Sequence, residues 1–555
     1  MYSTTVNTYN ARDQLKQIRQ YAGTEGSGTF QDTTMTYDGH GRLKTRHLPE
    51  QQVDPNNSAS TDHTTWEIYN PDDTIQKVTD ARGASQTFTY NNRHLVSSVT
   101  YSWPNGGTVP GPVTLSYDAA GNRISMTDGF GSVGYGYDQH SRLATETRTI
   151  NGVGTFAFAY GYNLANQLTS IVDPFGSLSY NFDTAHRLGS ITGTGYGSIP
   201  PFTSNIRYRA WGAVKSLNFG DGRSGSNLYN DRLQISRFEV SGLMSTEYEY
   251  ASPGQNDNDG RVKYVRNLSS TNSPFDRRFR YDQVGRMVEA LTGADARAGL
   301  QVSNDSPFYQ TYQYDALSHL TGRDGRAWSE PAASFSNHVY TNNRNGLWTY
   351  DADGNPLSQT SLQNTYNAAG QVTQVVSGPR ERFPNGVTVA KGHDGNGQRI
   401  RHQENTSAPI YYLRSSALGG AVVAELNQSG QRLRGYVYAG GEMLAKYENT
   451  IVEWQHQNPI TGSQRWTRVN GGLASFHSIT ELDPMGVDAG FIDWAEFQQE
   501  QQMGAEMTAP RYGDAHNLGT GCMGAGAPEA CGGGSLHEIL YGGREGRSSS
   551  DLGRG

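Results

Sequence analysis

Hydrophobic and polar positions alternate in short runs along most of the chain, and each run stops at an aromatic residue. The segments TFTY before Tyr90, VTLSY before Tyr117 and GYGY before Tyr137 show this period of two. Alternation of this kind predicts a β-strand with one buried face, because successive side chains point to opposite faces of a sheet. No long segment shows the period of a helix, so the pattern predicts an all-β chain.

A recurring polar motif follows the aromatic residue that ends each strand. It reads YDGHGRL from Tyr37, YDAAGNR from Tyr117, YDQHSRL from Tyr137 and YDQVGRM from Tyr281. The aspartate can accept a backbone N–H two residues on and start a turn, and the glycine supplies a positive φ. Each unit is therefore predicted to be a β-hairpin. The residues assigned to these turns are Tyr37, Asp38, Gly41, Arg42, Tyr117, Asp118, Gly121, Arg123, Tyr137, Asp138, Arg142, Tyr281, Asp282, Gly285 and Arg286.

The motif returns with a period of about 20 residues, as between Tyr117 and Tyr137, with longer insertions elsewhere, as between Tyr37 and Tyr69. The insertions are rich in Gly, Ser, Asn and Pro, which is typical of loops. A single hairpin is marginally stable in water, so successive hairpins are expected to pair side by side and stabilise their neighbours. We expect the tyrosine rings to form a ladder on one face. The arginines are expected to pair with carboxylates or turn carbonyls, with binding of an anionic ligand as the alternative.

Composition narrows the function classes. The 555 residues include 67 Gly and 33 Tyr, and 45 basic against 53 acidic side chains give a net charge of −8, so nothing predicts a nucleic-acid partner. No apolar run has the length of a membrane span, and the first residues do not resemble a secretory signal. Two alternatives would explain why no secretory signal is recognised: the protein is exported by another route, or the chain is a fragment of a longer product. The two cysteines, Cys522 and Cys531, lie near the C-terminus, so the body is not expected to depend on disulfides.

The motif and its period resemble the RHS or YD repeats of bacterial Rhs proteins, insecticidal toxin-complex C components and the teneurin YD-shell. The resemblance covers about residues 5–490. It implies tandem β-hairpins that form a spiralling ribbon or shell, which can enclose a C-terminal toxin or belong to an adhesion ectodomain. Complete shells of the family generally use longer arrays, so we expect an incomplete or open ribbon.

The resemblance also suggests a division of the chain. Residues 1–410 are expected to form the repeat array, and residues 411–490, which begin YYLRSSALGG, resemble the RHS-associated core region that closes such arrays. Residues 491–555 form a variable tail. Its start, FIDWAEFQQEQQMGAEM, predicts a short amphipathic helix, and its Gly-rich remainder predicts disorder.

The segment ELDPMGVDAG at 481–490 is similar to the D-P-x-G boundary of RHS C-termini. That resemblance implies a self-cleavage site at Asp483, followed by Pro484 and Gly486. Two positions depart from the family pattern, because Val487 replaces a leucine and Ser478 replaces a proline. The alternative is an ordinary β-turn, for which Asp-Pro-x-Gly is good chemistry.

The sequence is compatible with three classes of function. The first is a structural shell that encapsulates or displays a C-terminal or partner polypeptide, as in toxin delivery. The second is a cell-surface module of teneurin type that binds carbohydrate or protein. The third is an enzyme, for which the repeats offer no catalytic constellation, metal site or cofactor motif. A β-propeller is the rival architecture, but its blades need about 40–45 residues each. A secreted or cell-surface location follows from the resemblance.

Overall fold

The computed structural model describes residues 3–480 apart from gaps at 27, 52–62, 105, 197–200, 253, 270, 304–305, 328–329, 332–333, 360–361, 380–384 and 471–472. Strands dominate this part of the chain, and nearly all of them belong to two long antiparallel sheets. The predicted all-β ribbon of tandem hairpins is therefore confirmed.

The first sheet has 27 strands, each paired antiparallel with the next one along the chain. Among the described strands, β1 and β27 do not pair, so this sheet is open. We call it the first coil. Its strands are β1 (Thr4–Tyr9), β2 (Leu15–Tyr21), β3 (Phe30–Tyr37), β4 (Leu43–His47), β5 (Thr64–Tyr69), β6 (Ile75–Thr79), β7 (Ser85–Tyr90), β8 (Val96–Ser102), β9 (Val113–Tyr117), β10 (Arg123–Asp128), β11 (Gly131–Tyr137), β12 (Leu143–Ile150), β13 (Gly154–Tyr162), β14 (Leu168–Asp173), β15 (Gly176–Phe182), β16 (Leu188–Thr194), β17 (Thr203–Tyr208), β18 (Val214–Phe219), β19 (Ser224–Tyr229), β20 (Ile235–Val240), β21 (Met244–Glu249), β22 (Tyr264–Asn267), β23 (Arg277–Tyr281), β24 (Met287–Thr292), β25 (Tyr309–Tyr314), β26 (Leu320–Ala327) and β27 (Glu330–Pro331).

A small hairpin precedes the second sheet, which has 13 strands with the same sequential pairing and is called the second coil. The hairpin strands are β28 (Tyr340–Thr341) and β29 (Arg344–Asn345). The second coil comprises β30 (Thr349–Tyr350), β31 (Pro356–Gln359), β32 (Leu362–Tyr366), β33 (Val372–Ser377), β34 (Val387–His393), β35 (Arg399–Glu404), β36 (Ile410–Ser415), β37 (Ala421–Leu426), β38 (Arg432–Ala439), β39 (Glu442–Glu448), β40 (Ile451–Gln457), β41 (Gln464–Asn470) and β42 (Leu473–Thr480).

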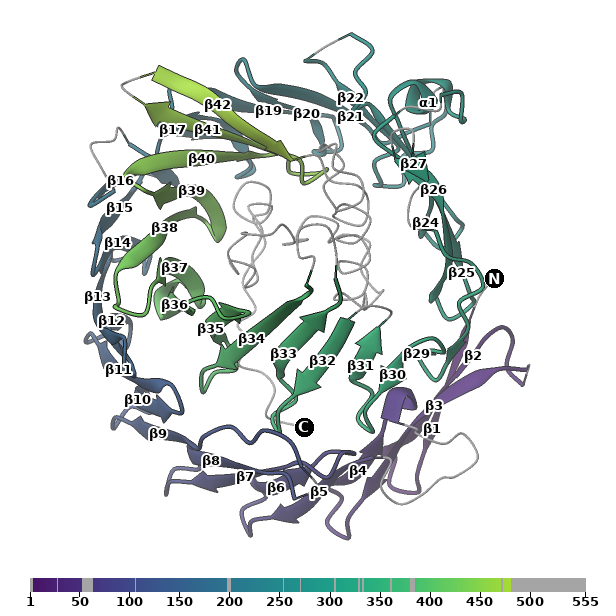
Figure 1. The fold of residues 1–555 in the computed structure, drawn as a ribbon, viewed down its shortest axis with the longest axis vertical. Coiled ribbons are helices and arrows are strands. Elements are labelled where there is room, and N and C mark those ends of the chain that lie inside the picture. The colour runs from purple at the N-terminus through teal and green to yellow at the C-terminus, as the bar shows by residue number, and fades with distance from the viewer. Residues whose placement is uncertain are drawn as a thin grey trace.

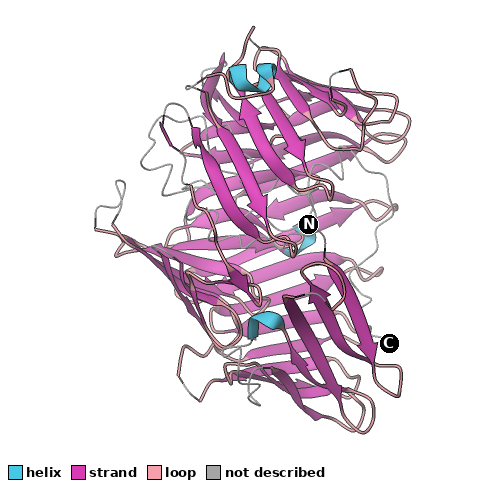
Figure 2. Cartoon of the chain, turned by 90° about the vertical axis from the view of Figure 1, so that its right-hand side faces the viewer, coloured by secondary structure: helices cyan, strands magenta, loops and turns pink. Residues whose placement is uncertain are grey.

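The two coils follow one spiral. The first coil runs round a ring, and strands β35 to β39 of the second coil lie inside it, next to β11 to β16 (Figure 1). Seen from the side, neighbouring hairpins lie side by side across the wall (Figure 2). The ribbon therefore winds past its own beginning instead of closing into a single ring.

Contacts between the coils, which we call the seam, keep the order of the chain. Gln51 Nε2 donates to Asp353 Oδ1 at 2.7 Å, and Arg277 Nη2 donates to Ser463 Oγ at 2.8 Å. Between these ends, Trp454 Nε1 donates to the carbonyl of Phe202 at 3.1 Å. Later residues of the first coil thus meet later residues of the second, as successive turns of one spiral must.

The main hydrophobic core lies at the seam. Ile171, Leu178 and Ile191 of the first coil share one buried cluster with Leu413 and Trp454 of the second. Burying a large apolar side chain is worth about 1.5–3 kcal/mol, so this cluster stabilises the overlap of the coils. The cluster also shows which face of the first coil points inward. The inward face carries the aromatic residues of the repeats and packs against the second coil.

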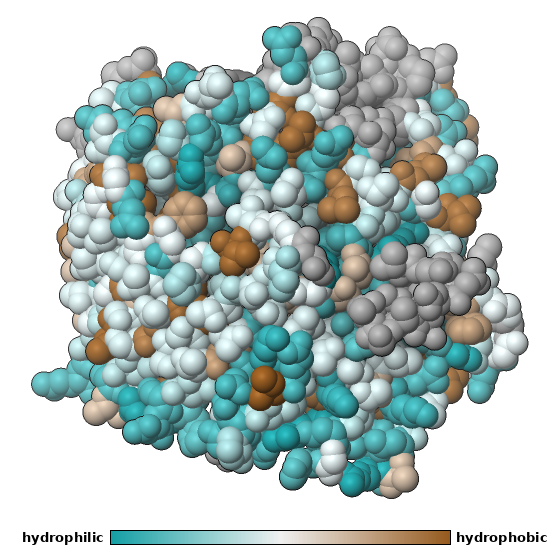
Figure 3. All heavy atoms as spheres, turned by 60° about the horizontal axis from the view of Figure 1, so that its bottom comes forward, coloured by the Kyte–Doolittle hydropathy of each residue, from teal (hydrophilic) through white to brown (hydrophobic). Residues whose placement is uncertain are grey.

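The opposite, outward face of β7 to β16 carries no charged side chain. Cross-strand neighbours on it are small, as in the row that joins Gly134, Thr147 and Ala157. Figure 3 shows strongly hydrophobic residues scattered singly among paler ones on one side of the molecule. The residues paired across this outward face are Thr87, Thr89, Ser98, Thr100, Thr114, Ser116, Ser125, Thr127, Ser132, Gly134, Gly136, Thr145, Thr147, Thr149, Thr155, Ala157, Ala159, Gly161, Ser170, Val172, Ser177, Ser179, Asn181, Ser190, Thr192 and Thr194.

Helical structure is sparse in the described residues. It consists of α1 (Gly293–Ala298) and the 3-10 turns η1 (Pro49–Gln51) and η2 (Ser416–Leu418). The sequence pattern did not indicate α1, which is too short for a periodic signal and ends at Gly299 with a φ of 74°. The helix expected after residue 490 lies outside the described residues.

The division proposed at residue 410 falls inside the second coil. It cuts β36 after its first residue, and β36 pairs with β35 through Arg401 and Tyr411. The break between the sheets lies earlier, between β27 and β30.

We predict that Gly220→Ala loosens the seam. A Cβ at this position would lie 2.3 Å from the carbonyl oxygen of Pro201 and 2.7 Å from Cζ2 of Trp454. Overpacking of this kind costs about 1–3 kcal/mol, measurable as a lower urea midpoint. Gly134→Ala is the control, because its Cβ would meet nothing within 4 Å. Equal midpoints for both variants would contradict the close approach of the coils.

Candidate functional site

The recurring turn is built around the carboxylate that follows the anchor tyrosine, the aromatic residue ending each repeat strand. In the repeat that begins at Tyr37, Asp38 Oδ1 accepts hydrogen bonds from the backbone N–H groups of His40 and Arg42, both at 2.9 Å. Gly41 has a φ of 88°, a value that favours glycine. Tyr37 lies opposite Leu43 while Thr36 lies opposite Thr45, so the return strand bulges by one residue.

The arginine of the motif ties its turn to the next one. Arg42 Nε donates to Asp38 Oδ2 at 2.7 Å, and its Nη1 donates to Asp73 Oδ1 in the following turn, also at 2.7 Å. The guanidinium lies over the ring of Tyr69, 4.4 Å from its centre. One side chain therefore holds its own turn, the next turn and the next anchor tyrosine.

The repeats at Tyr137 and Tyr281 use the same arrangement. Arg142 Nε binds Asp138 at 2.7 Å and its Nη1 donates to the carbonyl of Asn163 at 2.8 Å. In the later repeat, Arg286 Nε binds Asp282 Oδ2 at 2.7 Å.

Arg286 likewise reaches the following turn, donating from Nη1 to the carbonyl of Asp315 at 2.9 Å and lying 4.8 Å from the ring centre of Tyr314. Gly285 has a φ of 92°, and Ser141 takes the same left-handed conformation with a φ of 58°. The expected tyrosine ladder is thus an alternation of guanidinium and phenol groups.

Most anchor hydroxyls find a partner on the preceding repeat, whereas the Tyr350 hydroxyl accepts the backbone N–H of Asn345 at 2.8 Å. The phenol donates to a backbone carbonyl at 2.6–3.1 Å, usually that of the residue that begins the previous return strand. The donor and acceptor pairs are Tyr37 with Leu15, Tyr69 with Leu43, Tyr90 with Ile75, Tyr117 with Val96, Tyr137 with Arg123, Tyr208 with Leu188, Tyr229 with Val214, Tyr250 with Ile235, Tyr281 with Val262, Tyr314 with Met287, Tyr366 with Pro356 and Tyr438 with Val422.

The assignment of Arg123 to the arginine position of its turn is wrong. Asn122 occupies that position and donates from Nδ2 to Asp118 Oδ2 at 2.9 Å, while Gly121 supplies the positive φ of 92°. Arg123 lies one residue later, opposite Tyr117, and its Nη1 donates to Asn396 of the second coil at 2.9 Å. Asparagine therefore replaces the arginine in this turn, and Arg123 stands where the repeat at Tyr37 has Leu43, from which it reaches the seam.

The Asp or Asn that follows the anchor tyrosine, which we call the capping residue, often binds the side chain four positions later, and that partner varies between repeats. Capping aspartates bind arginine in the repeats at Tyr37, Tyr137 and Tyr281. Capping asparagines bind glutamine instead, as Asn163 binds Gln167 and Asn230 binds Gln234, each through an amide hydrogen bond of 2.9 Å. Search for a Tyr-Asp pair misses these turns, although the four-residue offset of matched side chains would have found them. The other amide pairs are Asn10 with Gln14, Asn367 with Gln371 and Asn427 with Gln431.

Hydrogen bonding favours the ionised form of the capping carboxylates. The backbone N–H and the guanidinium of Arg187 hold the pKa of Asp183 below its ordinary value. Desolvation alone would raise the pKa of Asp282, but hydrogen bonds from the backbone and side chain of Arg286 outweigh it and lower that pKa. Burial raises the pKa of the Tyr281 phenol to about 12, so it remains a neutral donor.

Buried charges cross the seam. Arg148 Nη1 lies 3.2 Å from Asp394 Oδ2, with 4% and 0% of these side chains exposed. Glu146 Oε2 accepts the Tyr160 hydroxyl and the backbone N–H of Ser416, both at 2.9 Å. Buried charges of this kind are costly unless paired, so the two coils must meet in register.

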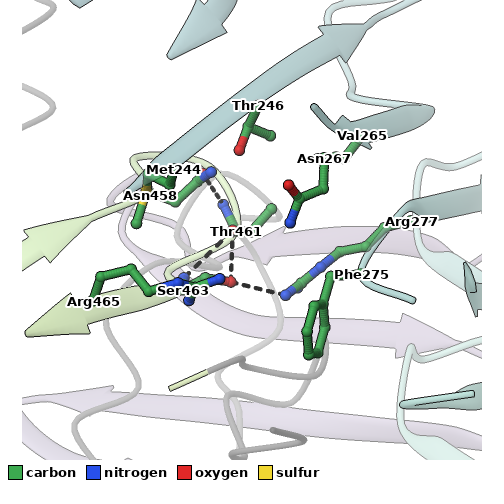
Figure 4. Close-up of a pocket in the computed structure, with 10 residues that line it drawn as sticks. All are labelled: Met244, Thr246, Val265, Asn267, Phe275, Arg277, Asn458, Thr461, Ser463 and Arg465. Carbon is green, nitrogen blue, oxygen red and sulfur yellow. Dashed lines mark hydrogen bonds between the residues drawn. The ribbon is translucent and has the colours of Figure 1, made fainter. Parts of the chain in front are cut away.

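A small polar pocket lies at the C-terminal end of the seam, where Arg277 meets Ser463. Figure 4 shows Arg277 reaching from the first coil toward Ser463 of the second, with Asn458 and Thr461 beside it. The pocket has a volume of about 20 Å³, which is room for about one water molecule. A water molecule of this kind can bridge polar groups of the two coils, but the pocket has no room for an organic substrate.

The boundary residues Asp483, Pro484 and Gly486 lie outside the described residues, as do the tail after residue 490 and both cysteines. In the part of the chain that is described, no group of three or more His, Cys, Asp or Glu side chains is placed to hold a metal ion.

Comparison with known proteins points to one repeat family and one fold. Residues 113–153, which carry the turns after Tyr117 and Tyr137, match the family model described as RHS Repeat. None of the curated proteins matches the chain.

Solved structures with the same fold include the Tc holotoxin pore of Photorhabdus luminescens and the TcdB2-TccC3 complex. Both are 16% identical to the chain, with a TM-score of 0.63 over 87% of it. The chain covers only 27% and 28% of the length of these solved chains. At this identity the likeness shows the fold alone.

We predict that the pair Asp282 and Arg286 is energetically coupled. Asp282→Asn and Arg286→Gln each remove one partner of the charged pair, whereas the double variant recreates the amide pair of other repeats. The double variant should therefore be more stable than the sum of the two single effects, by about 0.5–1 kcal/mol in urea unfolding. Asp231→Asn, at an exposed neighbouring position of another turn, is the control. Additive effects would show that the turn does not depend on this pair.

The same carboxylate should contribute to acid sensitivity. Because the pKa of Asp282 is lower in the folded than in the unfolded chain, its stabilisation is present above pH ~4 and is lost as the pH falls through the folded value. We therefore expect the urea midpoint to fall less between pH 5 and pH 3 in the Asp282→Asn, Arg286→Gln variant than in the unaltered chain. An identical pH dependence of both proteins would refute the assignment.

Proposed function

Because the chain is an RHS/YD-repeat protein with the shell fold of the Tc toxin structures, we propose that it forms part of the wall of a shell that encloses a polypeptide. The enclosed polypeptide is a C-terminal segment or a partner chain. The observation that carries the proposal is the ordered seam, in which the second coil continues inside the first along a shared direction. A ribbon that winds in this way surrounds a space without needing to close a ring.

The chemistry of the repeats supports a structural role. The carboxylates, guanidinium groups and phenols of the turns described above are engaged with one another or with backbone carbonyls, as for Asp38, Arg42 and Tyr37. An anionic ligand, the alternative for the arginines, would have to displace these contacts. The role we propose for these residues is therefore to hold successive hairpins together.

The proposed shell needs more ribbon than this chain supplies. The chain spans little more than a quarter of the length of the solved chains it resembles. We propose that further coils, from the same or a partner polypeptide, complete the wall. In the described residues no helix is long and apolar enough to cross a membrane. Secretion or display at a cell surface is part of the proposal.

We propose that the wall itself catalyses no reaction. Self-cleavage beside Asp483 stays a prediction, which the intact mass of the expressed chain would test.

Enclosure is tested with a reporter. A disordered peptide carrying a protease site is appended after residue 555, and its cleavage rate is compared with that of the free peptide. We expect cleavage to be severalfold slower on the intact chain, because this part of the wall shields the peptide from one side even before further coils complete the shell. A reporter cut as fast as the free peptide would contradict enclosure.

The seam variant Asp394→Asn should restore fast cleavage. It keeps the caps that Asp394 Oδ1 provides to Asn396 and Gln398 but leaves the buried Arg148 without its counter-charge. Breaking a buried pair costs about 3–5 kcal/mol, enough to open the seam. Asp231→Asn serves as the matched control, and protection unaltered in both variants would show that the seam does not control access.

A further inference from the structure

A second pocket lies where the second coil meets the turn between β14 and β15. It has a volume of about 470 Å³, which is within the range of small-molecule sites. Its walls include Phe175 of the first coil and Ile410, Arg432 and Tyr447 of the second. Nothing in the repeat architecture uses this space.

Arg432 is a fixed cation at this pocket. Its guanidinium lies 5.1 Å from the ring centres of Phe175 and Tyr196 and 4.4 Å from that of Tyr447, and its Nη2 donates to the carbonyl of Gly195 at 2.9 Å. In the described part of the chain it forms no ion pair, and its Nη1 is buried without a hydrogen-bond partner. The rings hold the guanidinium in place while its charge remains uncompensated.

The neighbouring arginine shows the contrast. Arg434 and Glu448 also line the pocket, but they bind each other at 3.0 Å, and Arg434 also binds Glu425 at 3.0 Å. The charge of Arg434 is therefore neutralised by carboxylates of the protein. Arg432 is left as the group that can attract an anion.

The rim carries a strained turn. Asn449 and Thr450, between β39 and β40, both line the pocket and have φ values of 49° and 67°. Thr450 is the one β-branched residue with a positive φ among those described, and glycine would fit this two-residue turn better. Both residues are exposed, and their side chains have no hydrogen-bond partner within the described structure. Strain retained at a pocket points to a use for the hydroxyl.

The strands around the pocket offer no free edge. β38 pairs with β37 and β39, and β39 pairs with β38 and β40. An extended peptide therefore cannot add to the sheet here through its backbone. The site favours a compact ligand recognised by side chains.

We propose that this pocket binds a carboxylated monosaccharide, such as a hexuronic acid. Arg432 binds the carboxylate, because its planar guanidinium matches the geometry of that group. The rings of Phe175 and Tyr447 contact the apolar face of the sugar. Asn449 and Thr450 hydrogen-bond to its hydroxyls. The site is independent of enclosure and gives the wall a binding function.

The test is calorimetric titration of the full-length chain with glucuronate, its methyl ester and glucose. Glucuronate should bind, and the two uncharged sugars should bind at least tenfold more weakly. Arg432→Gln should weaken glucuronate binding at least tenfold. Arg261→Gln, which removes a guanidinium 5.5 Å from the Tyr281 ring and outside the pocket, should not. Equal binding of glucuronate and glucose, or no binding of either, would overturn the proposal.

Thr450→Gly provides a second variant that keeps the fold. It should raise the melting temperature by relieving the backbone strain and should weaken glucuronate binding severalfold by removing the hydroxyl. Unchanged affinity would refute the role of Thr450. Displacement of glucuronate by a short peptide with a free C-terminus, but not by its amide, would show that the pocket takes a peptide carboxylate and would overturn the assignment to a sugar.

Discussion

The hydrogen-bonded turn that joins each hairpin to the next is the interaction on which the rest of this structure depends. A single hairpin buries too little surface to be stable, so a wall of hairpins needs a link that repeats at every step. Asp38 and Arg42 show how a few side chains supply it: the carboxylate shapes its own turn, and the guanidinium binds both that carboxylate and the following turn. In most repeats the phenol of the anchor tyrosine adds a hydrogen bond to the preceding repeat. The link is directional, so it can be extended for as many repeats as the gene encodes.

A second constraint acts between coils. Arg148 and Asp394 are almost completely buried, and each would be costly without the other. Such pairs fix which repeat of the second coil meets which repeat of the first, whereas the apolar cluster around Trp454 supplies much of the favourable burial. Hydrophobic contact alone would tolerate a slip of the ribbon, but paired charges in the seam do not. The small, uncharged outward face of β7 to β16 leaves the charges concentrated at the turns, the seam and the remaining strands.

The sequence predicts the local structure well because the local structure repeats. Alternation and the Tyr-Asp turn indicate the hairpins, and the period indicates the array. The features that the sequence does not predict depend on departures from the repeat pattern or on contacts between distant repeats. Arg123 was misplaced because Asn122 occupies the turn position in its repeat, a one-residue shift that the pairing of Tyr117 reveals. The seam contacts join residues hundreds of positions apart, as Gln51 and Asp353 do, and no pattern within the repeats encodes them. The strain at Thr450 is visible only in the backbone, since Asn-Thr is not a typical turn sequence.

The seam also supplies the most direct test of the account. Asp221 in the first coil and Thr467 in the second are both buried, and Thr467 Oγ1 donates to Asp221 Oδ2 at 2.5 Å. The measurement is the thiol content and non-reducing mobility of a chain with Asp221→Cys and Thr467→Cys, in which Cys522 and Cys531 are replaced by serine. A spiral of two coils in this register predicts an intramolecular disulfide and the loss of both thiols on mild oxidation. Two thiols that stay free in the folded, oxidised protein would contradict it.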